Sequence, residues 1–298
     1  MAEESTATRE QRVDVRKMYK LFINGAFVRS ESGRSTPLWD GRAFLANIAQ
    51  ASRKDLRDAV TAARAAQSRW WAQDPQLRGL MLYRLGEMLE ARRSEYIALL
   101  TEGNGNDLRS AREEIDVAID RVIWYAGWCD KYSALLSSRN PVAGPHFNCS
   151  TPEPMGVVGI LAPQAPLFLG TITSLLPPLV AGNATVLLAS ERDPRPAIAL
   201  AEAIALSDIP SGVVNVLTGF RNEIAPAMAK HDGIEAIACC REDLAAWGEI
   251  ERESAASIKR IRPFELERAV DYMHDRAQSL DGIADFCEIK TIWHPVGF

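Results

Sequence analysis

Three short, wholly apolar runs separated by long connections constrain this sequence more than any other feature. They span Gly156–Leu161, Ala184–Leu188 and Val213–Leu217, and each of the two connections exceeds 20 residues. Runs without polar alternation are typical of strands buried on both faces, and such long connections suit crossover helices rather than hairpin turns. The pattern therefore predicts βαβ units with right-handed crossovers, that is, an α/β fold built on a parallel sheet.

Turn residues stand where these units need them. Gly182-Asn183 would close the first crossover helix, and Asp193-Pro194 would open the second. After the third run, we expect a helix around Glu223–Lys230 and a fourth strand at Ile234–Ala238.

The region before the sheet predicts a hairpin and several helices. Leu21–Val28 carries Asn24-Gly25, a pair that tolerates the positive φ angles of a type I′ turn. Ser52 is a candidate N-cap for a helix from Arg53 to about Ala72. A second helix would present one apolar face made of Leu77, Leu80, Met81, Leu85, Met88 and Leu89.

A third long helix should start at a capping box formed by Ser110 and Glu113. We expect these helices to pack against the parallel sheet. Near the C-terminus, the composition predicts a helix at Phe264–Gln278. The segment Phe286–Trp293 then alternates apolar and polar residues, as a half-exposed strand does.

Several of these segments together resemble one family. PMGVVGILAP, AGNATVLLASE and IPSGVVNVLTG, read from Pro154 to Gly219, are similar to the nucleotide-binding domain of the aldehyde dehydrogenase superfamily. The likeness is greatest to the divergent, non-catalytic domain of family-16 members. LFINGAFV, WYAGWCDK and KTIWHPVG extend it toward both ends. The resemblance implies a Rossmann-like sheet and a C-terminal strand through which subunits associate.

The resemblance also implies a domain organisation. Residues 1–17 would be a disordered N-terminus, and residues 18–145 would form the hairpin and helical part. Residues 146–262 would form the Rossmann-like part, and residues 263–298 a helix and the oligomerisation strand. The family inserts its catalytic domain after the fourth strand. Here only about 45 residues separate that strand from the last one, too few for a domain of ordinary size.

The groups that oxidise an aldehyde in this family are missing from the sequence. The GQxC-type motif of the nucleophile and the LGGK-type motif of the glutamate are both absent. Pro163-Gln164-Ala165 stands where the family has a PWN motif, and alanine cannot donate a side-chain hydrogen bond to an oxyanion. The catalytic residues are therefore predicted as none.

Cofactor contacts are only partly retained. Ser190 and Glu191 resemble the end of the KPSE motif, whose glutamate contacts the adenosine ribose, but its lysine is lost. The TGxGxxxG motif keeps Gly219 and loses both later glycines, which removes the close backbone approach to a dinucleotide. We therefore expect no cofactor. If NAD binds, Ser190, Glu191 and Gly219 would contact it.

Three positions could supply chemistry in place of the family's missing groups. Cys239-Cys240, at a strand end, is the best candidate nucleophile, although small buried cysteines are common there. Arg221, beside a helix start near Asn222, could bind an anion or could be a solvated side chain. His146 and Cys149 lack a second pair of ligands at zinc-site spacing, so no metal site is predicted.

Composition limits the partners and the compartment. A net charge of −5 without a long basic run is a poor match to nucleic acid or to an anionic membrane. No apolar stretch reaches the length of about 18 residues that a membrane-spanning helix needs, and the polar N-terminus is unlike a signal peptide. Five irregularly spaced cysteines favour reduced thiols, and we therefore expect a cytoplasmic protein.

These observations predict a catalytically silent, aldehyde-dehydrogenase-like subunit kept for association. The partner would be a full-length aldehyde dehydrogenase, with self-association second, because an uncovered edge strand invites pairing. Two alternatives stay open: an NAD(P)-dependent oxidoreductase of the same superfamily, and a module that binds a nucleotide or metabolite. The predicted interface residues are Phe286, Ile289, Thr291, Ile292, Trp293 and Pro295.

Overall fold

A seven-stranded sheet runs through the centre of the computed structural model, which describes residues 15–103, 107–240, 244–264, 266 and 268–296. Its strand order is β12-β11-β8-β9-β10-β2-β3. The first five strands in this order are parallel, which confirms the α/β prediction. These strands are β8 (Val157–Leu161), β9 (Ala184–Leu188), β10 (Val214–Leu217), β11 (Ala236–Cys240) and β12 (Arg260–Phe264).

The fourth strand begins two residues later than predicted. Ile234 instead lies in a turn, where its N–H donates to the carbonyl of His231 at 3.0 Å. Glu235 then locks the start of the strand onto β8, because its N–H donates to the Val157 carbonyl and its carboxylate accepts the Val157 N–H at 2.8 Å.

The predicted N-terminal hairpin is confirmed and extends the main sheet. Strands β2 (Leu21–Ile23) and β3 (Ala26–Val28) flank Asn24 and Gly25, whose φ angles are 53° and 77°. Both angles are positive, as a type I′ turn requires. Strand β2 pairs antiparallel with β10. The hairpin therefore belongs to the same sheet as the parallel strands.

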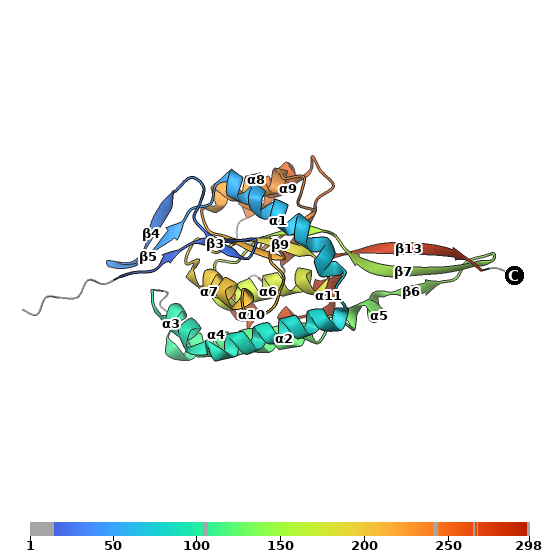
Figure 1. Ribbon diagram of the computed structural model, residues 1–298, viewed down its shortest axis with the longest axis horizontal. Helices are drawn as coiled ribbons and strands as arrows, with labels where there is room; N and C mark the ends of the chain where they lie inside the picture. Colours follow the sequence, from blue (N-terminus) through green and yellow to red (C-terminus); the bar gives the residue numbers. More distant parts are fainter. Residues whose placement is uncertain (1–14, 104–106, 241–243, 265, 267, 297–298) are drawn as a thin grey trace, which may run out of the picture.

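A second sheet was not predicted. It consists of β1 (Met18–Tyr19), β5 (Ala43–Ala49) and β4 (Ser35–Asp40), and the β4–β5 hairpin projects from the body (Figure 1). Most residues of β4 are exposed, so β4 lacks the apolar alternation that marks a half-buried strand.

Helices cover both faces of the main sheet. Helix α1 begins as predicted, because the Ser52 hydroxyl accepts the N–H groups of Lys54 and Asp55, each at 3.2 Å. One face carries α1 (Arg53–Trp71), α8 (Arg221–Lys230) and α9 (Leu244–Ser254) (Figure 1). The other face carries α6 (Leu167–Val180) and α7 (Arg195–Ile204), with α2 (Pro75–Ala91), α3 (Arg93–Thr101) and α4 (Leu108–Ala126) outside them.

Two details of the outer helices correct the sequence analysis. Helix α4 starts earlier than predicted: Asp107, not Ser110, is its N-cap, and the Ser110 N–H donates to the Asp107 carboxylate at 2.7 Å. In α2, Leu77 and Leu80 are 40% and 57% exposed. The buried stripe of α2 contains Leu85 and Leu89, as predicted, together with Arg78, Leu82 and Gly86.

The main sheet separates two hydrophobic clusters, one on each face. In β9, Val186 and Leu188 belong to the cluster under α1 and α8, whereas Leu187 belongs to the cluster under α6 and α7. All three side chains are fully buried. Burial on both faces explains why these runs carry no polar alternation.

A third sheet forms an arm that extends away from the body (Figure 1). It contains β6 (Ser138–Asn140), β7 (His146–Pro154) and β13 (Cys287–Pro295), in the order β13-β7-β6, and α5 (Tyr132–Leu136) packs near its base. Strand β13 pairs antiparallel with β7 from Cys287 to Pro295. Within the described part of the chain, the other edge of β13 pairs with no strand.

The prediction of a helix at Phe264–Gln278 is wrong. Phe264 ends strand β12, and the described residues between it and β13 form only short elements. Arg268 and His274 have extended backbones and so interrupt any continuous helix. The short elements are α10 (Ala269–Tyr272), a 3₁₀ turn η1 (Asp275–Ala277) and α11 (Leu280–Ala284).

The predicted division into parts at residues 145 and 262 stays a prediction. Strands from residues 18–145 join the sheet of residues 146–262, as does β12, so these parts share one core. Of the predicted disordered segment 1–17, residues 1–14 lie outside the described residues. Arg16 and Lys17 form ion pairs with Glu102 and Glu202. Among the described residues, no helix has both the length and the apolar character to cross a membrane.

Candidate functional site

Three loops meet at the carboxyl ends of the central parallel strands. Ala162–Pro166 follows β8, Ala189–Asp193 follows β9, and Thr218–Phe220 follows β10. Ligands of open α/β sheets bind in the crevice outside these strand ends. We call this region the strand-end crevice.

The polar side chains of the first two loops bind one another. The Ser190 hydroxyl donates to Gln164 Oε1 at 2.8 Å, and the Arg192 N–H donates to the same oxygen at 3.1 Å. The Ser190 oxygen also accepts the Arg192 N–H at 3.2 Å. Ser190 is 2% exposed. Its hydroxyl is therefore already engaged within the chain.

Glu191 and Arg221 close the crevice from the other side. A carboxylate oxygen of Glu191 accepts the backbone N–H of Arg221, the first residue of α8. The guanidinium of Arg221 reaches across the strand ends and donates to the carbonyl of Ala162, directly after β8. At the helix start that was predicted to attract an anion, the Arg221 N–H is thus bound by the chain's own carboxylate.

The three predicted cofactor residues do lie together. Ser190, Glu191 and Gly219 line one cavity, with residues of β4 and β5, but its volume is only about 60 Å³. Typical ligand sites measure roughly 300 to 1,000 Å³. Gly219 has a φ of +145°, and a Cβ there would lie 3.2 Å from the Ala51 nitrogen. The glycine therefore has a structural reason within the chain itself.

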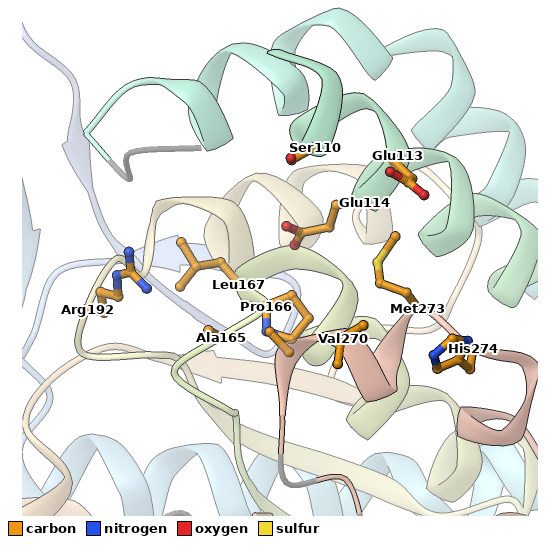
Figure 2. A pocket seen from close by; sticks show the side chains of 11 residues that line it. Ser110, Glu113, Glu114, Ala165, Pro166, Leu167, Arg192, Val270, Met273 and His274 are labelled. Carbon is orange, nitrogen blue, oxygen red and sulfur yellow. The ribbon is translucent and has the colours of Figure 1, made fainter. Parts of the chain in front are cut away.

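A larger cavity of about 490 Å³ lies beside this crevice, over the start of α6 (Figure 2). Helix α4 provides one wall with Ser110, Glu113 and Glu114. The segment at α10 provides the opposite wall, and Arg192 lies at one end (Figure 2). The apolar lining consists of Ala165, Pro166, Leu167, Ala269, Val270 and Met273, and His274 completes it.

Glu114 is the buried charged group of this cavity. It is 6% exposed, and its Oε1 accepts the N–H groups of Phe168 and Leu169 at 2.8 and 3.1 Å. It thereby caps the first turn of α6, which has no side-chain cap of its own. Burial raises the pKa of the Glu114 carboxyl, while the two N–H groups lower it.

The cysteines give little support for nucleophilic chemistry. Cys239 is 3% exposed and sits inside the sheet, where it pairs in register with Leu161. The side chain of Cys240 lies outside the described residues. Burial raises the pKa of Cys129 and Cys287 to about 12, so these thiols stay protonated near neutral pH. Among the described residues, no three His, Cys, Asp or Glu side chains gather at a metal-binding arrangement.

Strand β13 carries most of the predicted interface residues on one face. Side chains alternate along a strand, so Ile289, Thr291, Trp293 and Pro295 share a face and Ile292 lies on the other. Ile289, Ile292 and Trp293 are 59%, 42% and 58% exposed. Phe286 corrects the prediction: it is 2% exposed and packs in the main hydrophobic cluster, so it is not available to a partner.

The sequence and the fold match known proteins over most of the chain. Residues 35–262 match the aldehyde dehydrogenase family. The chain is 33% identical over 247 residues to the aldehyde dehydrogenase DhaS of Bacillus subtilis, covering 81% of this chain and 49% of DhaS. It is 31% identical over 225 residues to human mitochondrial aldehyde dehydrogenase, covering 74% of this chain and 43% of that enzyme.

A solved structure gives the same result. The NAD+ complex of an aldehyde dehydrogenase from Bacillus cereus superimposes with a TM-score of 0.78 at 28% identity, covering 83% of this chain and 50% of that one. A chain with this sheet, these crossovers and this match is a member of the aldehyde dehydrogenase family. It spans about half the length of the curated relatives it matches. The nearer likeness to family-16 members stays an expectation.

Sequence reasoning found the strand-end residues but missed what surrounds them. The ends of β8, β9 and β10 could be located because the strands are continuous apolar runs. The closure by Arg221 and the role of Glu114 were missed. Both depend on contacts between residues more than 50 positions apart, and no local pattern reports such contacts.

Proposed function

We propose that this chain is a catalytically silent member of the aldehyde dehydrogenase family that acts as a structural or regulatory subunit. The observation that carries the proposal is the closed strand-end crevice. Glu191 and Ser190, the residues expected to contact a nucleotide, are bound within the chain by Arg221, Gln164 and Arg192. A dinucleotide would have to break these contacts and also enlarge a cavity of about 60 Å³.

The reacting groups support the same proposal. Ala165 lines the larger cavity at the end of β8, where the family's oxyanion asparagine is expected, and a methyl group donates no hydrogen bond. Cys239 is buried, so it offers no accessible thiol there. Ala165 and Cys239 therefore supply neither an oxyanion donor nor a nucleophile to the cavity.

Association is proposed to run through the arm. Strand β13 has an edge without a partner among the described residues, and its exposed apolar residues Ile289 and Trp293 lie on one face. Edge strands of this kind pair readily with another chain. We propose a full-length aldehyde dehydrogenase as the partner and a second copy of this chain as the alternative. Among the described residues four cysteines form no disulfide, which supports a reducing, cytoplasmic compartment.

Calorimetry with NAD+ and NADH tests whether the strand-end crevice binds a dinucleotide. We expect no saturable heat at millimolar cofactor, because Arg221 and Glu191 occupy the strand ends. Arg221→Ala, which removes the guanidinium but keeps the backbone N–H, should not restore micromolar binding, since both later glycines of the phosphate loop are lost. Micromolar binding to the unaltered protein would favour the alternative, an NAD(P)-dependent oxidoreductase.

Native mass spectrometry with Trp293→Lys tests the arm. We expect the unaltered protein to form a complex, with a co-expressed full-length relative or with itself. The substitution should weaken association at least about tenfold, because a charge would be buried in the apolar contact. Leu206→Lys is the matched control, since Leu206 is 57% exposed and follows α7, outside the strands of the arm. Equal loss in both variants, or a monomer in every case, would contradict the proposal.

A further inference from the structure

Glu114 presents one carboxylate oxygen to the larger cavity. Its Oε1 accepts both N–H groups of α6, and among the described residues its Oε2 accepts no hydrogen bond. The residue is 94% buried, because its exposed fraction is 6%. Figure 2 shows the carboxylate extending from α4 toward the start of α6, between Pro166 and Leu167 on one side and Glu113 on the other.

From this geometry we propose that the cavity binds a protonated primary amine carried on a short aliphatic body, with the ammonium group on Glu114 Oε2. A buried carboxylate is costly unless it is paired or fully hydrogen-bonded. An ammonium group supplies both a positive charge and hydrogen-bond donors to Glu114 Oε2.

The charges around the cavity favour a cation over an anion. The two N–H groups of α6 that could bind an anion already donate to Glu114, and Pro166 has no N–H. Glu113 adds a second carboxylate on the same wall. No charged side chain contributes to the raised pKa of Glu114, which arises from burial. Arg192 and His274 also line the cavity, but both residues are exposed and neither is a cause of the shifted pKa of Glu114.

The apolar lining fits the rest of the ligand. Leu167 and Met273 face each other across the cavity, and Val270 is 49% exposed at its wall (Figure 2). A volume of about 490 Å³ lies within the usual range for small-molecule sites. One wall comes from Ala269–His274, beyond the residues that match the family. This wall therefore lies outside the residues that match the family.

Titration calorimetry with three ligands of equal chain length tests the proposal on the full chain. The probes are hexylamine, hexanol and hexanoic acid near neutral pH, where an alkylamine is protonated. We expect hexylamine to bind at least about tenfold more tightly than hexanol, because a hydrogen bond to a charged group contributes more than a neutral one. Hexanoate should bind most weakly. Equal affinity for hexylamine and hexanol, or no binding by either, would overturn the proposal.

Glu114→Gln assigns the preference to one residue. A glutamine oxygen can still accept the Phe168 and Leu169 N–H groups, so the cap on α6 is kept while the charge is removed. Binding of hexylamine should fall at least about tenfold and binding of hexanol should not change. Glu87→Gln makes the same chemical change at an exposed position of α2 outside the cavity lining and should alter hexylamine binding by less than about threefold. Unchanged binding of hexylamine to Glu114→Gln would refute the assignment.

A third variant locates the site independently of any charge. Ala269→Trp adds bulk at an exposed position of the cavity wall. Binding of both hexylamine and hexanol should be lost if they enter this cavity. Retained binding of both ligands would place their site elsewhere and would overturn the proposal, even if Glu114→Gln failed to fold.

Discussion

Arg195→Met is expected to lower the free energy of unfolding by about 3 to 5 kcal/mol in urea denaturation. The Arg195 side chain is 1% exposed, and its Nε donates to both carboxylate oxygens of Asp193, at 3.0 and 3.1 Å. It also donates to Glu102 at 2.7 Å. Burial opposes the charge of Arg195, but these carboxylates outweigh it and leave its pKa raised. Removing the guanidinium would take a positively charged partner from the Asp193 carboxylate, which is 2% exposed.

Two controls separate the buried charge from a general effect of losing an arginine. Arg84 pairs with Asp208 at 3.0 Å, but both side chains are at least half exposed. Arg84→Met should therefore change the unfolding free energy by less than about 1 kcal/mol. The double variant Asp193→Leu with Arg195→Met should recover part of the loss, because no unpaired charge remains. A loss below 1 kcal/mol for Arg195→Met alone would show that Asp193 is solvated or protonated there.

The sequence was sufficient to predict the central strands because their burial is visible in composition. Ala184–Leu188 has no exposed position, so every residue is small, apolar or internally hydrogen-bonded, and the predicted bounds agree with those of β9. The Asn24-Gly25 turn was equally local, since its positive φ angles depend on residue type. Features set by one segment's own burial or dihedral angles could be predicted.

Strand β12 shows where that reasoning fails. Arg260–Phe264 contains two arginines and a proline, which disfavour a strand on propensity alone. The segment is a strand because β11 offers it a parallel edge, with Ala236 to Cys240 paired to Arg260 to Phe264. Pairing between distant segments overrode local preference. The same pairing places Phe264, the first residue of the predicted helix, in a strand.

The candidate site divides in the same way. The positions of Ser190, Glu191 and Gly219 could be predicted, because parallel strands end at one edge of the sheet. The sequence could not predict whether these groups are available to a ligand. Their availability depends on Arg221, whose side chain reaches the carbonyl of Ala162, 59 residues away in sequence. A site's composition was therefore predictable and its closure was not.

Asn183→Ala is expected to lower the free energy of unfolding by about 3 kcal/mol and to loosen the arm. Asn183 is fully buried, and its side chain accepts the Gly156 N–H at 2.9 Å and donates to the Phe286 carbonyl at 3.0 Å. Gly156 follows β7 and Phe286 precedes β13, so one side chain fixes the bases of both arm strands to the start of β9. Alanine would remove this partner from the half-buried Gly156 N–H and from the buried Phe286 carbonyl, and an unsatisfied buried group costs about 1 to 3 kcal/mol.

Because Asn183 contacts the bases of β7 and β13, Asn183→Ala should change hydrogen exchange in the arm as well as stability. Amide hydrogen exchange should accelerate in β7 and β13 more than in α7, and association should weaken along with stability. Trp293→Lys should weaken association without lowering monomer stability, because Trp293 is exposed. Asn222→Ala, at an exposed asparagine in α8, is the matched control and should change stability by less than about 0.5 kcal/mol. If Asn183→Ala lowered stability with no change of exchange in the arm, its role would be confined to the core. That result would contradict the expectation that Asn183 fixes the bases of β7 and β13.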